Sequence, residues 1–272
     1  MICLLDMDVL RYRIGFACEY ELFWYSNMEE PVRGIKAWKQ YREDHPEDNA
    51  RDVFTDKVIE PVEYCLHSCK MQIEHILTRC KTNKLQGFMT GKGNFREEIA
   101  TIKPYKGNRP DRKPVHYDAL TEYLTRTWKG ITVDGIEADD ALAMHQSGTT
   151  CIASIDKDLH QIPKKHYDFY HDKRFVISEA EADRNLYAQI IAGDSTDNIG
   201  GVPRVGLKTA YKLLRNSSSI EYYAKTALEQ YQRAFDKNPK AFGGLEPLDA
   251  LTENARLVYL LRYPEDKWEF PL

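Results

Sequence analysis

Short apolar segments that end in acidic residues set the strongest limit on how this chain can fold. Residues Ile2–Leu5 and Thr150–Ile155 have the composition of buried strands, and each is followed directly by aspartate. A third segment, Gly130–Val133, precedes a helix that opens with acidic residues. In open α/β sheets, ligands bind at the carboxyl ends of the strands. The sequence therefore predicts an α/β sheet whose acids meet at one edge.

The acids at these strand ends are of the type that binds divalent cations. Glu137-Ala138-Asp139-Asp140 places three carboxylates in four positions, where they repel one another at neutral pH. The positive end of a helix dipole offsets only about 1 kcal/mol per charge. Mg²⁺ or Mn²⁺ would compensate the remainder, because both prefer oxygen ligands. An exposed acidic first turn of a helix is the alternative, and it becomes weaker because Asp6, Asp156 and Asp158 also follow the carboxyl ends of predicted strands.

A glycine-rich turn follows two further carboxylates in the stretch Gly193–Leu214. Asp194 and Asp197 precede this turn, which leads into a basic helix. The free N–H groups and the positive dipole end at the start of a helix suit a phosphate oxygen. Such a turn binds a sugar-phosphate backbone without reading bases. A nucleotide-binding P-loop does not fit, because Leu207 separates the glycine from the lysine that the motif requires to be adjacent.

The segment Lys103–Pro114 is basic and interrupted by prolines. Its prolines and Gly107 disfavour one straight helix, so we expect a bridge or arch over a cleft. Tyr105 could stack on a base while Lys106 and Arg109 bind phosphate. A solvated basic loop is the alternative to this nucleic-acid contact.

Charge is segregated along the chain although the net charge is only -4. Residues 19–60 contain eleven acidic and six basic side chains, whereas residues 92–113 contain seven basic and three acidic ones. Local fields rather than the net charge steer a polyanion, so the net charge does not exclude nucleic acid.

Hydropathy predicts a protein that does not enter a membrane. No apolar stretch among the 272 residues approaches the length of a membrane span, and the run at residues 1–5 is too short for a signal peptide. A cytoplasmic location is the corresponding expectation. The six cysteines contain no C-x-x-C pair, which favours buried reduced thiols over a zinc site.

Hydrophobic periodicity and capping residues predict the remaining elements. We expect an irregular insertion or mobile surface segment at residues 26–49. We expect short strands at 85–89, 167–170 and 174–177. Helices are expected at 9–25, 56–81, 117–128, 178–192, 207–214, 220–235 and 248–261.

Five sequence blocks, in this order, resemble the structure-specific 5'-nucleases. This family includes phage 5'-3' exonucleases, flap endonucleases and the nuclease domain of bacterial DNA polymerase I. The blocks are L-L-D at residues 4–6, Y-K-G-N-R at 105–109, G-I-E-A-D-D at 135–140, S-I-D-K-D at 154–158 and G-D-S-T-D-N-I-G-G-V-P-R-V-G-L-K-T-A at 193–210. The chain length looks most like that of the stand-alone phage enzymes.

This resemblance implies a fold and a domain organisation. The fold is a PIN-like, Rossmann-like α/β core with a mainly parallel sheet flanked by helices, a helical arch and a C-terminal helix-three-turn-helix. Residues 1–192 would form the nuclease core, with the arch at about 92–116. Residues 193–272 would form the DNA-binding region and C-terminal helices.

The resemblance also implies the site residues. Two divalent ions would be held by Asp6, Glu137, Asp139, Asp140, Asp156, Asp158, Asp194 and Asp197. The implied catalytic residues are Lys106, Arg109, Asp6, Asp140 and Asp156. The implied DNA contacts are Arg96, Tyr105, Lys106, Arg109, Arg204, Gly206, Lys208 and Thr209. A potassium ion at the glycine turn would contact Val202 and Val205.

One position departs from the family pattern. Members often carry an aspartate just past the second strand, but this chain reads Met89-Thr90-Gly91-Lys92 there. We expect one metal to be held more loosely, or through water and Asp8.

The sequence thus predicts a two-metal 5'-3' exonuclease or flap endonuclease of replication or repair. Its implied substrates are DNA with a 5' end or flap, and RNA in RNA–DNA hybrids. We expect a monomer that works with replication proteins. The alternatives are a non-catalytic DNA-binding protein, which would not need converging acids, and a PIN-type ribonuclease, which would lack the glycine turn and arch.

Overall fold

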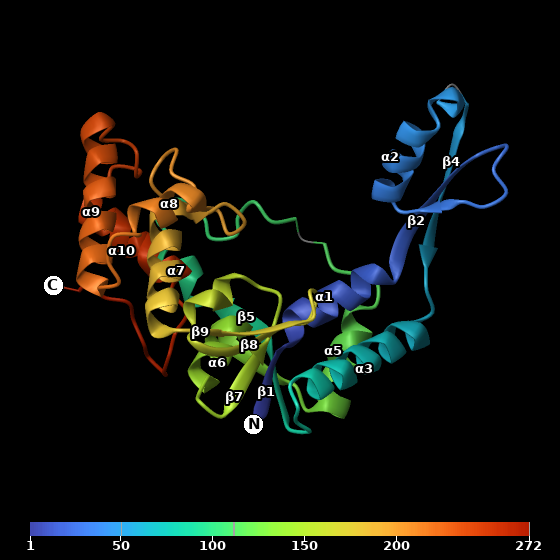
Figure 1. Cartoon of the computed structure of the whole chain (residues 1–272), viewed down its shortest axis with the longest axis horizontal. Coiled ribbons are helices and arrows are strands. Elements are labelled where there is room, and N and C mark those ends of the chain that lie inside the picture. Colours follow the sequence, from blue (N-terminus) through green and yellow to red (C-terminus); the bar gives the residue numbers. More distant parts are fainter. Residues whose placement is uncertain (50, 111, 272) are drawn as a thin grey trace. The chain divides into compact units, whose positions relative to one another are not determined.

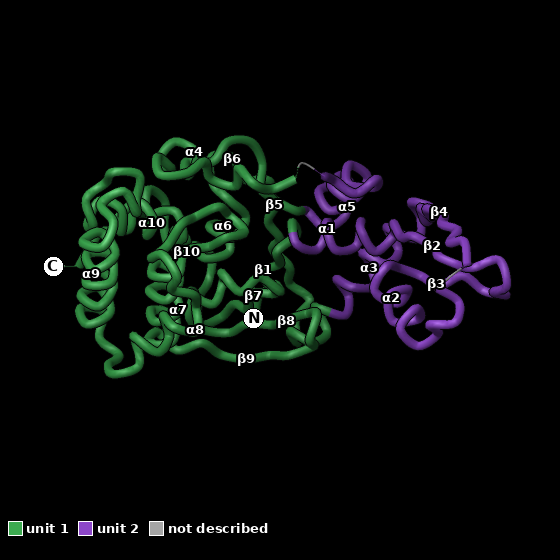
Figure 2. The backbone as a smooth tube through the Cα atoms, turned by 90° about the horizontal axis from the view of Figure 1, so that it is seen from above, with its two compact units in different colours: residues 1–8, 76–111, 130–272 green, residues 9–75, 112–129 purple. Residues whose placement is uncertain are grey.

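The computed structural model describes residues 1–49, 51–110 and 112–271, and the chain forms two compact units (Figures 1 and 2). Unit 1 consists of residues 1–8, 76–111 and 130–272, and unit 2 of residues 9–75 and 112–129. Within the described ranges, no helix combines the length and hydropathy that crossing a membrane requires.

A six-stranded sheet forms the centre of unit 1. Its order is β6-β5-β1-β7-β8-β9, and all neighbours are parallel except the antiparallel pair β8 and β9. The strands are β1 (Ile2–Asp6), β5 (Leu85–Asn94), β6 (Ile131–Gly135), β7 (Thr150–Ala153), β8 (Lys164–Asp168) and β9 (Lys173–Ile177). Strand β1 pairs on both sides, and Cys3, Leu4 and Leu5 are completely buried, as expected for a strand covered on both faces. The predicted mainly parallel α/β sheet is confirmed.

Helices cover the sheet and continue into a second core in the same unit. The helical elements are α4 (Phe95–Ile99), α6 (Ala138–His145), η2 (Asp158–Gln161), α7 (Glu179–Ala192), α8 (Leu207–Leu213), α9 (Ile220–Lys237) and α10 (Pro247–Val258). Ala141 and Leu142 of α6 pack with Leu4, Phe88 and Ile152 of the sheet. The helices predicted in this part of the chain are confirmed, with ends displaced by a few residues.

The C-terminal helices share one buried cluster with α7. Ile190 and Ile191 of α7 belong to the same cluster as Tyr231 of α9 and Leu251 of α10. Between α7 and α8 lie two short antiparallel strands, β10 (Gly193–Asp194) and β11 (Ile199–Gly200). The predicted division at residue 193 stays a prediction, since apolar packing continues across it.

The secondary structure of the N-terminal region, in unit 2, differs from the prediction. The helix expected at 9–25 is α1 (Met7–Ala17) followed by strand β2 (Glu19–Tyr25). Phe23 and Tyr25 alternate with more exposed residues and contact Trp38, with ring centroids 5.7 and 4.8 Å apart. Alternating aromatic residues of this kind favour a strand over a helix.

The expected irregular insertion is likewise ordered secondary structure. Strand β2 pairs with β3 and β4 in an antiparallel sheet. The remaining elements of unit 2 are β3 (Val32–Arg33), α2 (Ile35–Asp44), η1 (Pro46–Asp48), β4 (Val53–Ile59), α3 (Val62–Arg79, ending in unit 1) and α5 (Tyr117–Trp128). The helix predicted from residue 56 begins at Val62, because residues 56–59 continue strand β4.

The predicted arch region contains one short helix. Strand β5 extends to Asn94 and α4 follows directly, with Asn94 accepting a side-chain capping bond from the Arg96 N–H at 3.0 Å. Residues 100–110 and 112–116 form turns and irregular segments, and residue 111 lies outside the described residues. A helical arch therefore stays a prediction.

Arg96 is a core residue rather than a surface contact. Its side chain is 1 % exposed and donates two bonds to the Asp140 carboxylate, at 2.7 and 2.8 Å. It also donates to the carbonyl oxygens of Leu257 (2.9 Å) and Tyr259 (2.6 Å). This corrects the prediction that Arg96 contacts DNA, because the guanidinium is enclosed and bonded within the protein.

The Asp140 carboxylate has no acceptor position left for a metal. Besides Arg96, it accepts the backbone N–H groups of Glu137 and Leu261, both at 3.0 Å. These bonds occupy the four acceptor positions of a carboxylate. The structure therefore corrects the predicted ligand and catalytic roles of Asp140, which instead ties α6 to the C-terminal segment.

Substitution of Arg96 by methionine is expected to destabilise the fold by about 3–5 kcal/mol, because it leaves the Asp140 charge buried without a partner. Urea denaturation would measure the free energy of unfolding. Arg126→Met, which breaks the exposed pair with Glu122, is the control and should change stability by less than about 0.5 kcal/mol. Equal effects in the two variants would contradict the buried-pair assignment.

Candidate active site

The carboxyl ends of β1 and β7 bring Asp6 and Asp156 together. Asp6 is 1 % exposed and accepts a bond from the Ser154 hydroxyl at 2.7 Å. The same hydroxyl oxygen accepts the Asp156 N–H at 3.0 Å. Neighbouring parallel strands thus place acids that are 150 residues apart in sequence within one hydrogen-bond network.

Electrostatic repulsion links the other carboxylates to this end of the sheet. The pKa of Asp139 is raised well above its usual value by burial and by the charges of Asp6, Asp156, Glu137 and Asp158. This links the first turn of α6 to the ends of β1 and β7. The predicted acids of these three segments therefore share one field.

Asp158 extends this field to the turn after α7. Burial and the charges of Asp156, Asp194 and Asp197 raise the pKa of Asp158 to about 7. Seven of the eight carboxylates predicted to bind metal are therefore close enough to influence one another's charge. Asp140 is the exception, because it points into the core. Carboxylates that repel one another in this way need added positive charge to remain ionised.

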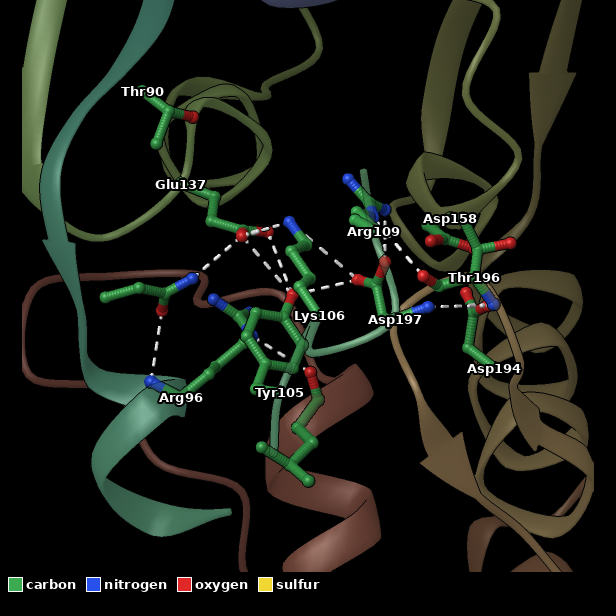
Figure 3. Close-up of polar contacts among 12 residues, drawn as sticks. Thr90, Arg96, Tyr105, Lys106, Arg109, Glu137, Asp158, Asp194, Thr196 and Asp197 are labelled. Carbon is green, nitrogen blue, oxygen red and sulfur yellow. Dashed lines mark hydrogen bonds and ion pairs between the residues drawn. The ribbon is translucent and has the colours of Figure 1, made fainter. Parts of the chain in front are cut away.

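The basic segment supplies part of that positive charge (Figure 3). The Lys106 ammonium pairs with Glu137 and lies 3.8 Å from an Asp197 carboxylate oxygen. The Arg109 guanidinium pairs with Asp197 and donates to the Thr196 carbonyl at 3.2 Å. Both predicted phosphate-binding residues therefore lie at the acidic edge of the sheet.

Tyr105 has a different place from the one predicted. It is only 9 % exposed. The hydroxyl donates to the Asp197 carboxylate at 2.9 Å and lies 3.2 Å from a Glu137 carboxylate oxygen. Burial and the Glu137 charge raise the pKa of Tyr105 far above its usual value, so the phenol stays a donor. The expectation that its ring stacks on a base is corrected, because the ring packs in the core.

The glycine turn ends in the predicted basic helix. The Val202 N–H donates to the Ile191 carbonyl at 2.8 Å, and the Val202 carbonyl accepts the Val205 N–H at 3.1 Å. Gly206 immediately precedes α8, and Arg204, Lys208 and Thr209 are exposed there. Their DNA contacts, and a potassium ion at Val202 and Val205, stay predictions.

Neutral side chains that the sequence analysis did not single out hold the acids. Asn94 donates to Glu137 at 2.7 Å, Gln189 donates to Asp158, and Ser154 bonds Asp6 as described. Ser154 lies in the S-I-D-K-D block and could have been noticed there. Asn94 and Gln189 carry no sequence signal.

Residues 89–92, where the aspartate is missing, lie within β5 and run beside Asp134 of β6. The Asp134 carboxylate accepts the Lys92 N–H at 2.7 Å, and a Cβ at Gly91 would lie 2.1 Å from it. Asp8 accepts the Thr90 N–H at 2.9 Å. A carboxylate at residue 91 would therefore collide with one supplied by β6.

A separate group could hold a cation by geometry alone. His45, Glu47 and Asp48 of unit 2 place ligand atoms within 4.8 Å of one another, and within the described ranges no other trio of His, Cys, Asp or Glu does so. Asp48 is already paired with Arg51 at 2.7 Å. No three of the seven carboxylates described above therefore have ligand atoms within 4.8 Å of one another.

Sequence comparison finds relatives over about half of the chain. No family model matches. A 5'-3' exonuclease of Buchnera aphidicola subsp. Acyrthosiphon pisum is 33% identical over 153 residues, covering 49% of this chain and 53% of that protein. DNA polymerase I of Rhizobium leguminosarum is 33% identical over 154 residues, covering 50% of this chain and 15% of that protein. The chain thus spans about half the length of the exonuclease relatives it matches.

Structure comparison extends the likeness to nearly the whole chain. A T5 5'-exonuclease variant covers 94% of this chain with a TM-score of 0.55 and 15% identity, and 86% of that chain is covered. A bacteriophage T5 flap endonuclease, in a pseudo-enzyme–product complex with DNA and metal ions, has a TM-score of 0.56 at 17% identity, covering 94% and 88% of the two chains. The resemblance of this chain to the structure-specific 5'-nucleases is therefore confirmed, by sequence over about half its length and by fold over nearly all of it.

Proposed function

We propose that this protein is a divalent-metal-dependent 5'-nuclease that hydrolyses phosphodiester bonds in DNA carrying a 5' end or flap. The observation that carries the proposal is the gathering of seven carboxylates from four segments at one sheet edge, beside two basic side chains. The similarity to 5'-3' exonucleases, and the DNA and metal ions bound to the T5 neighbour, support it. A DNA-binding protein without catalysis would gain nothing from concentrating acids beside its phosphate contacts.

The donor chemistry of the site fits Mg²⁺ or Mn²⁺. All seven side chains offer carboxylate oxygens, and burial together with the charges of neighbouring carboxylates raises the pKa values of Asp139 and Asp158. The residues that would hold two ions are Asp6, Glu137, Asp139, Asp156, Asp158, Asp194 and Asp197. When bound, such ions polarise phosphate oxygens and lower the pKa of water.

The chain's own basic groups would position the nucleic acid. Lys106 and Arg109 would bind the scissile phosphate, where one such donor is worth about 3 kcal/mol in the transition state. Arg204, Gly206, Lys208 and Thr209 would hold the duplex backbone, with K⁺ at the carbonyls of Val202 and Val205. RNA in RNA–DNA hybrids, replication proteins as partners, a monomeric state and a cytoplasmic location belong to the same proposal.

A substrate panel tests the proposal directly. The purified chain would be incubated with flapped DNA, blunt duplex, an RNA–DNA hybrid and single-stranded RNA, each with Mg²⁺ or EDTA. Cleavage of flapped or 5'-ended DNA only with Mg²⁺ is expected. Binding without cleavage would indicate a DNA-binding protein, and cleavage of RNA alone would indicate a PIN-type ribonuclease.

Asp156→Asn is expected to lower DNA cleavage by at least about a hundredfold, because it removes one ligand charge from the centre of the acidic field. Single-turnover rates on flapped DNA would measure this, with circular dichroism to establish folding. Asp236→Asn on the exposed face of α9 is the matched control and should retain full activity. Full activity of a folded Asp156→Asn protein would refute the metal assignment.

The raised pKa of Asp158 predicts a specific pH dependence of stability. In EDTA, Asp158 is protonated in the folded state up to about pH 7 but only up to about pH 4 when unfolded. The folded state therefore binds the extra proton, and this group's contribution to stability falls as pH rises between those values.

The free energy of unfolding of Asp158→Asn minus that of the unsubstituted protein should accordingly increase from pH 4 to pH 7. Buried His166, whose pKa is lowered to about 4, acts in the opposite direction but cancels in this difference. Urea denaturation at several pH values would measure it. A difference that does not change with pH would contradict the assignment, and saturating Mg²⁺ should reduce the difference.

Lys208→Ala is expected to weaken DNA binding to the same extent for unrelated sequences, because the turn contacts phosphates rather than bases. Losing one phosphate contact should also reduce the slope of log affinity against log salt by about 0.9. Fluorescence anisotropy at several salt concentrations, in Ca²⁺ to prevent cleavage, would measure both. Lys237→Ala, at the end of α9, is the control. An unchanged slope for Lys208→Ala would remove this residue from the interface.

A further inference from the structure

Two basic side chains form ion pairs with carboxylates that the proposed function assigns to metal binding. Lys106 pairs with Glu137 and approaches Asp197, while Arg109 pairs with Asp197 (Figure 3). Lys106 is only 28% exposed in its side chain, and Glu137 and Asp197 are 12% and 11% exposed. Contacts that are this enclosed are weakly screened by solvent, so they compete effectively with other cations.

The backbone at Lys106 is shaped to make this contact. Lys106 has a φ of 54°, in the left-handed region that residues with a side chain rarely adopt. Its N–H donates to the Asp197 carbonyl at 2.9 Å, and the Arg109 N–H donates to the Lys106 carbonyl at 3.0 Å. A costly conformation held by two hydrogen bonds at a site is a feature associated with function.

The surrounding segment is fixed independently of the two charges. Asn198 donates to the Pro104 carbonyl and Asn108 to the Ser195 carbonyl, each at 2.9 Å. The buried Tyr105 hydroxyl bonds Asp197. The backbone can therefore stay in place while the long side chains of Lys106 and Arg109 exchange partners.

We propose that Lys106 and Arg109 are intramolecular counter-ions of Glu137 and Asp197, that a divalent cation must displace them in order to bind there, and that this displacement releases them toward the substrate phosphate. This inference rests on the proposed function and adds an order of events to it. The ammonium and guanidinium groups offset the negative charge of these two acids and hold them close together until a divalent cation replaces them. Bound metal then replaces their charge, and the freed cations face an anionic ligand.

The proposal predicts opposite effects of one substitution on two properties. Lys106→Met removes a competitor for Glu137, so the metal should bind more tightly. The same substitution removes a proposed phosphate contact, so cleavage should fall. If Lys106 only bound phosphate, its substitution would leave the metal affinity unchanged. If Lys106 only supported the fold, its substitution would lower the metal affinity.

Mn²⁺ titration of the DNA-free full chain, followed by the EPR signal of free Mn²⁺, tests this without any activity measurement. Lys106→Met is expected to raise the Mn²⁺ association constant about fivefold. Lys106→Arg keeps the charge and should stay within about twofold of the unsubstituted protein. Lys103→Met is the matched control, since the exposed Lys103 forms no ion pair among the described residues, and it should change affinity by less than about twofold.

A folded Lys106→Met protein whose Mn²⁺ affinity is unchanged or weaker would overturn the proposal. Circular dichroism would establish folding, and Arg109→Met, at a more exposed position, supplies a second variant expected to bind Mn²⁺ more tightly. Hydrogen exchange gives an independent result: peptide 104–110 should keep its protection when Mn²⁺ binds, and general loss of protection would contradict side-chain exchange. If the chain cleaves no DNA but Lys106→Met still raises Mn²⁺ affinity, the proposed nuclease function fails and the counter-ion role stands.

Discussion

Repulsion among gathered carboxylates is the constraint on which the rest of unit 1 depends. Burial strengthens this repulsion, as the raised pKa values of Asp139 and Asp158 show. The chain offsets part of it with neutral donors such as Ser154 and Gln189, and part with the cations of the basic segment. The site therefore contains more negative charge than its own basic side chains can balance. A cation-binding site requires this imbalance, whereas an ordinary protein surface avoids it.

The parallel sheet explains how such a cluster can form at all. Strand β1 lies between β5 and β7, so Asp6 emerges beside the end of β7 and opposite Phe88 of β5. In the turn after α7, the backbones at Gly193 and Gly201 lie so close together that a Cβ at Gly193 would be 2.2 Å from the Gly201 nitrogen. With φ of 70° at Gly193, only glycine suits this position, and it delivers Asp194 to the edge.

Sequence patterns predicted the sheet and the acids at its edge because both depend on local signals. Apolar strands followed by acids are visible in the chain, and parallel topology then decides where Asp6 and Asp156 meet. Interactions that form only in three dimensions could not be predicted, such as the enclosure of Tyr105 and the role of Asn94. Strand β2 was missed because its alternating aromatic residues overlap with a helical pattern, and its longer pairing partner, β4, lies about thirty to forty residues further along the chain.

The fate of Asp140 connects fold stability with the site. Consecutive helical residues point about 100° apart, so Asp139 can face the acidic edge while Asp140 faces the core. Asp140 accepts the Glu137 N–H at 3.0 Å and both Arg96 bonds, which fixes the start of α6 against the C-terminal segment. Because Glu137 and Asp139 belong to that same turn, a buried ion pair outside the site holds two of its acids in position against their mutual repulsion.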